Sequence, residues 1–305
     1  MASQLSVLMT FMLCLAFYPG SVRPRQTVSL REIGAIEVPA WFRVSGAQIL
    51  DSLSALVWSA AHPQLLHCSA TGCQVVYQDT ARILGAFSTS SSERGAVEVV
   101  ATNPFYIRRV SAGEQRDLLP ARPDSSVYAA TRLRRGWVIA TTGSPEQRQE
   151  SVSLNYLPLP GVSDQPVEVH LGTRFVHLSS TGDSAAIAQE VYHPFRAWTI
   201  VVGGGRAASR QQSLDLSTIG PIDTVSFVAL PRLSVENGAL LTLADLRSDA
   251  RILIHLDTSG RLLSSVHIEA PVGFISSRPD LKTILAVRNR GADEIVFYRY
   301  AISRS

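Results

Sequence analysis

The feature that most constrains the fold is one pattern that returns six times along the chain. Each copy has an apolar strand, a polar turn that often contains proline, a second strand, a turn that often contains glycine and a third strand; a shorter strand precedes them. The apolar strands are residues 55–58, 97–100, 137–140, 185–188, 240–243 and 284–287. Repeats of about 40–50 residues built from short strands are typical of β-propeller blades. The chain is therefore predicted to be all-β, a six-bladed β-propeller.

The two ends of the chain complement each other. The sixth copy ends with residues 294–300 as its third strand, and only five residues follow. A strand within residues 28–38 can supply the one that is missing. A propeller that borrows an N-terminal strand in this way closes its ring and leaves few exposed strand edges. We therefore expect residues 27–305 to form one propeller closed by its N-terminal strand.

Other arrangements remain open from the sequence. The first strand of each copy is expected at residues 41–45, 84–88, 126–131, 174–179, 225–230 and 272–276. Residues 46–60 also match a helical face, through Ile49, Leu53, Leu56 and Val57. A helix there would remove the first blade. A seven-bladed ring and a pair of stacked sheets are further alternatives.

The N-terminal residues 1–26 differ from the rest. Residues 5–17 are almost wholly apolar, which suits the core of a signal peptide and is short for a membrane-spanning helix. No basic residue precedes this run, and no clear cleavage site follows it. We expect a signal peptide or an N-terminal anchor, and a periplasmic or extracellular protein.

The charge balance argues against nucleic acid as a partner. The whole chain has 28 basic and 25 acidic residues, and removal of residues 1–26 takes away Arg23 and Arg25 and leaves a net charge of about +1. A surface of this kind has no excess of cations to follow a phosphate backbone. Contact with a membrane is expected only through an uncleaved N-terminal segment.

Two cysteines remain in the mature chain, Cys68 and Cys73. They flank a short Gly-containing loop between two apolar runs, which predicts a β-hairpin with the two sulfurs opposite each other. We expect a disulfide between them, in line with an oxidising compartment. A zinc site is the rival interpretation, but it would need two more ligands. A reduced pair of small core residues is the third.

The fifth and sixth copies, ALLTLADLRSDARILIHLDTSGRLLSSVHIEAPVGFISSRPDLKTILAV, resemble the six-bladed propellers of the NHL and TolB-like type. Many bacterial members of that class are exported. The shared motif, a strand, Asp-x-x-Gly and a second strand, is architectural. The resemblance therefore implies a fold and no particular activity.

Candidate binding residues gather where a propeller usually binds, at one mouth of its central channel. Four are in turns between second and third strands and three are near links between blades: His62, Asn103, His193 and Arg247, then Arg82, Arg122 and Arg174. Several arginines around one mouth would suit a carboxylate, a phosphate or an acidic sugar, because guanidinium groups bind such anions bidentately. Solvated arginines in an arginine-rich chain are the simpler explanation.

The sequence contains no recognisable catalytic motif. We therefore predict a binding platform for a protein, a peptide or a glycan, without catalytic residues, metal or cofactor. The alternative is a calcium-dependent, lactonase-like hydrolase with its metal in the channel, for which the candidate ligands are Glu37, Asp79, Asp124 and Asp223. A purely structural role in an envelope assembly is a third possibility.

Overall fold

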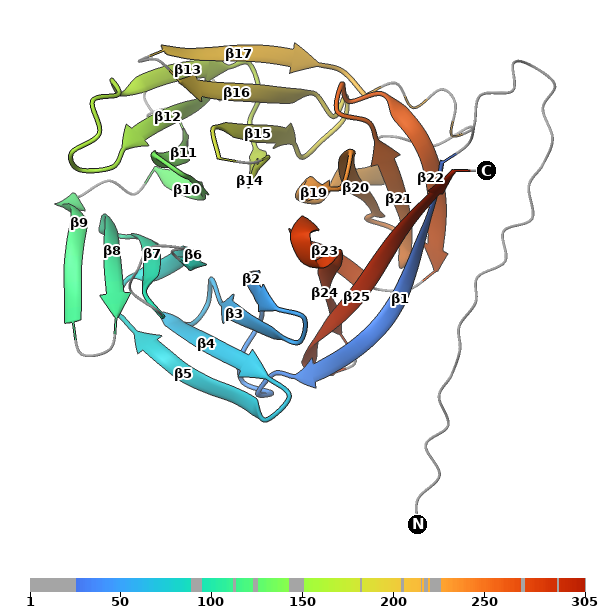
Figure 1. Cartoon of the computed structure of the whole chain (residues 1–305), viewed down its shortest axis with the longest axis horizontal. Helices are drawn as coiled ribbons and strands as arrows, with labels where there is room; N and C mark the ends of the chain where they lie inside the picture. The colour runs from blue at the N-terminus through green and yellow to red at the C-terminus, as the bar shows by residue number, and fades with distance from the viewer. Residues whose placement is uncertain are drawn as a thin grey trace.

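The computed structural model shows a ring of blades around a central opening (Figure 1). The structure describes residues 26–88, 95–111, 114–122, 126–142, 151–181, 183–203, 206–214, 216, 219, 226–269, 272–289 and 291–304. No residue in these ranges is in an α-helix, and none forms a helix long and apolar enough to cross a membrane. The segment predicted as a signal peptide or anchor lies outside them, apart from residue 26.

Six antiparallel sheets form the six blades. Within each sheet, the strands are arranged in order from the channel to the outer edge of the ring. Blade 1 has β2 (Gly46–Asp51), β3 (Ser54–Trp58), β4 (Gln64–Ser69) and β5 (Gly72–Gln78). Blade 2 has β6 (Arg82–Ser88), β7 (Val97–Thr102), β8 (Phe105–Ser111) and β9 (Glu114–Arg122). Blade 3 has β10 (Val127–Leu133), β11 (Gly136–Thr142), β12 (Val152–Pro158) and β13 (Val167–Leu171).

The other three blades repeat this order with two variations. Blade 4 has β14 (Val176–Ser180), β15 (Ala185–Glu190), β16 (Ala197–Gly203) and β17 (Arg206–Gln212). Blade 5 has β18 (Phe227–Ala229), β19 (Leu233–Val235), β20 (Gly238–Asp245), β21 (Ala250–Leu256) and β22 (Leu262–Glu269). Blade 6 has β23 (Val272–Arg278), β24 (Thr283–Asn289), β25 (Asp293–Arg304) and β1 (Gln26–Glu37). The six-bladed, all-β prediction is thus confirmed.

Blade 6 joins the two ends of the chain. β1 is its outermost strand and pairs antiparallel with β25 over almost its whole length, from Gln26 opposite Arg304 to Glu37 opposite Glu294. The predicted N-terminal closure is confirmed. The ring is therefore closed by pairing between residues more than 250 positions apart. Hydrogen bonds join β25 to β1 at this point, and the chain itself does not.

The first strand of blade 1 differs from the prediction. Residues 41–45 are not a strand; the strand is β2, which starts at Gly46. Asp293 of blade 6 holds the preceding segment, since its carboxylate accepts a hydrogen bond from the Val44 backbone at 2.7 Å and one from Arg43 at 3.1 Å. Residues 46–60 therefore contain the strands β2 and β3 and no helix. They reverse at Asp51, which accepts hydrogen bonds from Leu53 N–H and the Ser54 hydroxyl.

The innermost strand of blade 5 is also shorter than predicted. It is split into β18 and β19, which pair separately with β20. Pro231 lies in the gap. Proline has no N–H to give to a ladder, so a break at this position is expected.

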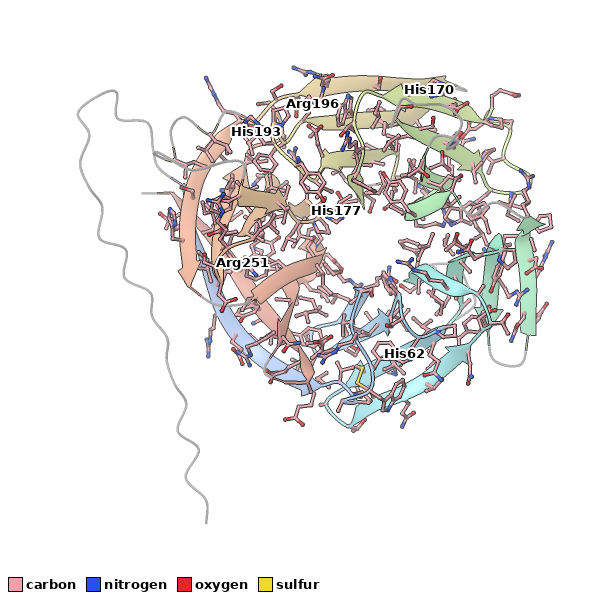
Figure 2. The ribbon with its side chains drawn as sticks, turned by 180° about the vertical axis from the view of Figure 1, so that it is seen from behind. His62, His170, His177, His193, Arg196 and Arg251 are labelled. Carbon is pink, nitrogen blue, oxygen red and sulfur yellow. A yellow bond between two sulfur atoms is a disulfide. The ribbon has the colours of Figure 1, made fainter. Side chains whose placement is uncertain are left out.

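Apolar side chains fill the spaces between neighbouring blades (Figure 2). Because both faces of a blade are covered, second strands are apolar at consecutive positions: in β7, Val99 faces blade 1 and Val100 faces blade 3. This explains why the repeats read as continuous apolar runs. Each fully buried residue of this size contributes roughly 1.5–3 kcal/mol.

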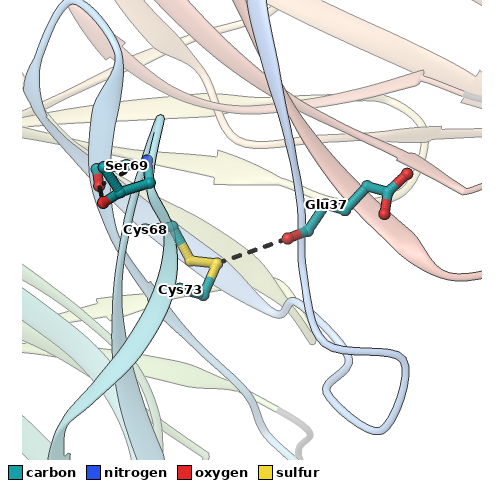
Figure 3. The surroundings of a disulfide bond; sticks show 5 residues. Glu37, Cys68, Ser69 and Cys73 are labelled. Carbon is teal, nitrogen blue, oxygen red and sulfur yellow. Dashed lines mark hydrogen bonds between the residues drawn. A yellow bond between two sulfur atoms is a disulfide. The ribbon is translucent and has the colours of Figure 1, made fainter.

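The predicted disulfide between Cys68 and Cys73 is present (Figure 3). The two residues are direct cross-strand partners in the β4–β5 hairpin. The Cys73 sulfur also lies 3.7 Å from the Glu37 backbone oxygen at the end of β1. A disulfide sulfur carries no hydrogen, so this is a packing contact. The bridge therefore sits at the seam between the closing strand and blade 1.

Candidate active site at the mouth of the channel

The seven residues singled out from the sequence all lie on one face of the ring. We call it the link face; it carries the links between blades and the turns between second and third strands. His62, Asn103, His193 and Arg247 lie in those turns, Arg174 in the β13–β14 link, Arg82 at the start of β6 and Arg122 at the end of β9. All are exposed to solvent except His62, which is half-buried.

The structure divides these seven residues among four blades. Arg82, Asn103 and Arg122 cross the link-face end of blade 2, while Arg174 and His193 share blade 4. His62 is in blade 1 and Arg247 in blade 5. Figure 2 shows His62 and His193 on opposite sides of the ring, so they form no common site.

Blade 4 carries an aromatic group that the sequence did not predict. The Phe175 ring lies 6.1 Å from that of Tyr128 in blade 3 and 6.4 Å from that of Tyr192, both edge-on. Phe175 is 46% exposed and Tyr192 is 50% exposed. We call Tyr128, Phe175 and Tyr192 the blade 4 aromatic group. Large aromatic rings that are exposed together on one surface are typical of a ligand site.

The inner strand of this blade adds an imidazole. His177 is the second residue of β14, and Figure 2 places it beside the central opening. Burial lowers the pKa of His177 to about 4, although a hydrogen bond with the Ala229 backbone of blade 5 acts in the opposite direction. The ring is therefore neutral at pH 7, and it can accept a proton at one nitrogen while it donates at the other.

An ion pair fixes the turn that carries Tyr192 and His193. The Glu190 carboxylate accepts hydrogen bonds from Arg196 at 2.8 and 3.0 Å and from the Thr173 hydroxyl at 2.7 Å. Arg196 also donates to the Gly172 carbonyl at 2.8 Å. Burial alone would raise the pKa of Glu190, but these hydrogen bonds outweigh it and the pKa is lowered. The turn and the link into β14 are thereby tied together.

Backbone and amide hydrogen bonds complete this frame. Val191 donates to the Phe175 carbonyl at 3.2 Å, and Ala229 of blade 5 donates to the Val191 carbonyl at 2.7 Å. Gln189, the cross-strand partner of His177, is buried and donates from its amide to the Phe195 carbonyl at 3.1 Å. The aromatic rings and His177 are thus held by elements from blades 3, 4 and 5.

Blade 1 carries a second, smaller aromatic group across the mouth. Trp41 in the β1–β2 link is 51% exposed, and its ring lies 5.5 Å from those of Phe42 and His62. Phe42 is fully buried and stacks on His62 at 6.1 Å. The inner strand β2 contains no histidine. Blade 1 therefore offers a ring for binding but no counterpart of His177.

Of the four candidate calcium ligands, the two that the structure describes do not form a metal centre. Glu37 ends the outermost strand of blade 6, far from the channel, and Asp79 is occupied by hydrogen bonds from the Tyr77 and Tyr106 hydroxyls. Asp124 and Asp223 lie outside the described residues. Among the residues that the structure describes, no group of three or more His, Cys, Asp and Glu side chains could hold a metal.

The blade 4 aromatic group is only weakly indicated by the sequence. Phe175 is next to Arg174 and Tyr192 is next to His193, so both rings stand in the links and turns that supplied the polar candidates. Aromatic residues in those segments are thus a signal that could have found them. The contribution of Tyr128 has no such signal, because it depends on the packing of blade 3 against blade 4.

The fold is similar to that of several solved propellers. No protein-family model matches the chain, and no curated protein sequence is similar to it. The PQQ-bound form of an aldose sugar dehydrogenase from Streptomyces coelicolor has a TM-score of 0.59 and 14% identity, with coverage of 92% of this chain and 100% of the other.

Two further propellers are similar at lower identity. A catalytically inactive variant of virginiamycin B lyase from Staphylococcus aureus, in which a histidine is replaced by alanine, was solved with quinupristin. Its TM-score is 0.52 at 10% identity, with coverage of 90% of this chain and 99% of the other. The propeller domain of Cps50 (Swd1) from Myceliophteria thermophila has a TM-score of 0.55 at 8% identity, with coverage of 84% and 83%.

These comparisons correct the expected function. The dehydrogenase and the lyase match over nearly their whole length, and both are enzymes. The prediction of a platform without catalysis is therefore wrong as the first interpretation of this fold. At these identities the similarity establishes the six-bladed fold, and it does not single out the NHL and TolB-like type.

Proposed function

We propose that this chain is an enzyme whose active site lies on the blade 4 side of the channel mouth, and that it is a lyase. In the proposed reaction His177 takes a proton from a carbon next to a carbonyl or carboxylate group. The electrons of that C–H bond form a C=C bond, and the bond to the leaving group on the next carbon breaks. The leaving group departs with its electron pair and is then protonated.

The observation that carries the proposal is His177 itself. A neutral imidazole beside the channel can act as a general base, and the exposed Phe175 lies two residues before it in the chain. A base with a pKa of about 4 is weak. A bound carboxylate beside the ring would raise that pKa toward neutrality, because a nearby negative charge favours the imidazolium form.

The surrounding residues have supporting roles in this proposal. The blade 4 aromatic group binds the ring of the substrate, and Arg174 stabilises the negative charge that develops on the carbonyl or carboxylate oxygens. His193 in the neighbouring turn is the candidate for protonating the leaving group. A solved propeller of similar fold is a lyase that loses activity when one histidine becomes alanine, which supports a histidine as the base.

The test compares His177→Asn with His267→Asn, an exposed histidine on the outer strand β22. Elimination is followed through the ultraviolet absorbance of the new conjugated double bond, and hydrolysis of lactones and esters by titration of released acid. We expect His177→Asn to lower elimination by about 10²–10⁴-fold, and His267→Asn to leave it unchanged. Equal rates in the wild type and in His177→Asn would place catalysis elsewhere.

The disulfide supports a second part of the proposal. A bridge between Cys68 and Cys73 indicates an oxidising compartment. We propose that the apolar segment within residues 1–26 directs export to the periplasm or the extracellular space. Export would account for both the apolar segment and the disulfide.

A further inference from the structure

The two ends of the channel are built differently. On the face opposite the link face, four cations lie in ion pairs within or between adjacent turns: Arg134 with Asp183, Arg135 with Asp164, Arg278 with Asp280 and Lys282 with Glu236, at 3.0–3.6 Å. Each of these four cations has an acidic partner on its own face. Two arginines at the link-face end of blade 2 have no such partner among the described residues.

Two arginines of blade 2 have no acidic partner among the described residues. Arg82 and Arg122 are exposed and form no salt bridge with any residue that the structure describes. Asp79, three residues before Arg82, is already bonded to Tyr77 and Tyr106 and lies 3.8 Å from Arg108. Asp124, two residues after Arg122, lies outside the described residues. Within the described residues, neither guanidinium group is bonded to an acid.

The register of the blade places Asn103 between them. Arg82 pairs with Thr102, the residue before Asn103, and Arg122 pairs with Phe105, two residues after it. The three side chains thus form a row across the link-face end of the blade, from its innermost to its outermost strand. Three strand spacings make this row about 14 Å long. We call these residues the blade 2 row.

Rings and cations are separated around the same mouth. The exposed aromatic rings are in blades 1 and 4, at Trp41, Phe175 and Tyr192, and the blade 2 row lies between those blades on one side of the ring. A small molecule with one ring and one carboxylate cannot contact all three positions. A ligand that repeats both groups along a chain can do so.

We infer that the substrate is an acidic oligosaccharide, a chain of sugar rings that carry carboxylate groups. This inference rests on the proposed function and names its substrate class. The apolar faces of sugar rings stack on exposed aromatic side chains, and their carboxylates bind Arg82 and Arg122, which offer paired donors. A carboxylate on a sugar ring also makes the adjacent C–H bond acidic, which is the bond that His177 is proposed to break.

Binding is tested by calorimetric titration of the wild-type protein with a galacturonate hexamer. A neutral galactose hexamer and hexaglutamate serve as comparison ligands. We expect the galacturonate hexamer to bind at least about tenfold more tightly than either one, with an affinity that falls as salt is added. A neutral hexamer that binds equally well would overturn the role of the arginines. Tighter binding of hexaglutamate would replace the sugar by an acidic peptide.

Matched double variants locate the site. Arg82→Gln with Arg122→Gln is expected to weaken binding of the galacturonate hexamer at least about tenfold. The control, Arg134→Gln with Arg278→Gln on the opposite face, is expected to leave it unchanged. Equal losses in the two double variants, or none in the first, would overturn the inference. Melting temperatures confirm that each variant is folded.

The same titration separates this inference from the proposed function. His177→Asn should bind the hexamer and fail to turn it over. Binding by the wild type without any product would overturn the proposed catalysis and leave the ligand class standing. Elimination on another substrate without binding of the hexamer would overturn the ligand class alone.

Discussion

Blades 1 and 4 face each other across the channel and use the same plan at the link face. In each blade a His-Pro pair lies in the turn between the second and third strands, and an exposed aromatic residue lies in the preceding link. In each, a buried acid fixes that link: Asp293 binds the Val44 backbone, and Glu190 binds Thr173 and Arg196. The framework is therefore repeated.

The difference lies in what the inner strand adds. Blade 4 places His177 on β14 beside the opening, and blade 1 has no titratable group at the start of β2. Blade 1 instead carries the disulfide and the seam with β1. The histidine proposed as the base is thus found in one copy of a repeated framework, and the opposite copy instead lies against the closing strand β1.

The largest expected effect comes from the acid that anchors blade 4. Glu190→Ala removes a buried carboxylate and leaves the partly buried Arg196 without its partner, which should lower the free energy of unfolding by about 3 kcal/mol. Asp293→Ala should cost less, because its partner Arg43 is about half exposed. Urea unfolding of both variants measures the comparison. A larger loss in Asp293→Ala than in Glu190→Ala would contradict this order.

The second effect concerns pH and blade 4 alone. The pKa of His177 is lowered to about 4 from 6.5, so the unfolded chain binds this proton more readily than the folded one. Stability should therefore fall as the pH drops from about 6.5 to 4, by at most about 3 kcal/mol from this residue. His177→Asn should flatten that part of the stability curve, measured by melting temperature against pH. Parallel curves for the wild type and the variant would contradict it.

The third effect belongs to blade 1. Replacement of both Cys68 and Cys73 by serine removes the bridge between two residues that are five positions apart in the sequence. The bridge closes only a short loop. The loss of unfolding free energy should be about 2 kcal/mol. The wild type in reducing agent should show the same loss. An unchanged urea midpoint would show that the seam with β1 does not depend on the bridge.

The smallest effect on stability separates the two aromatic groups by function. Phe175→Ala and Trp41→Ala change rings that are about half exposed, so each should lower stability by less than about 1 kcal/mol. Phe175→Ala should lower kcat/KM for the substrate more than Trp41→Ala, because Phe175 lies on the blade of His177. Equal losses would mean that the two groups contribute alike.

Local patterns in the sequence determined most of the fold. The six apolar strands were recognisable because a blade buries both faces of its second strand, and the disulfide because its cysteines flank a hairpin turn. The closing strand followed from the missing strand of the last repeat. Each of these features depends on residues that are near in the sequence or on a count of repeats.

Contacts between distant segments decided the rest. The first strand of blade 1 begins at Gly46 because Asp293, about 250 residues away, holds the preceding segment. The candidate site exists because Tyr128 packs on Phe175 and because Ala229 lies against His177. No periodicity records such contacts, since they arise only when neighbouring blades pack around the channel. The sequence by itself thus determined the repeat and its closure, and the tertiary structure decided which side chains meet at the mouth.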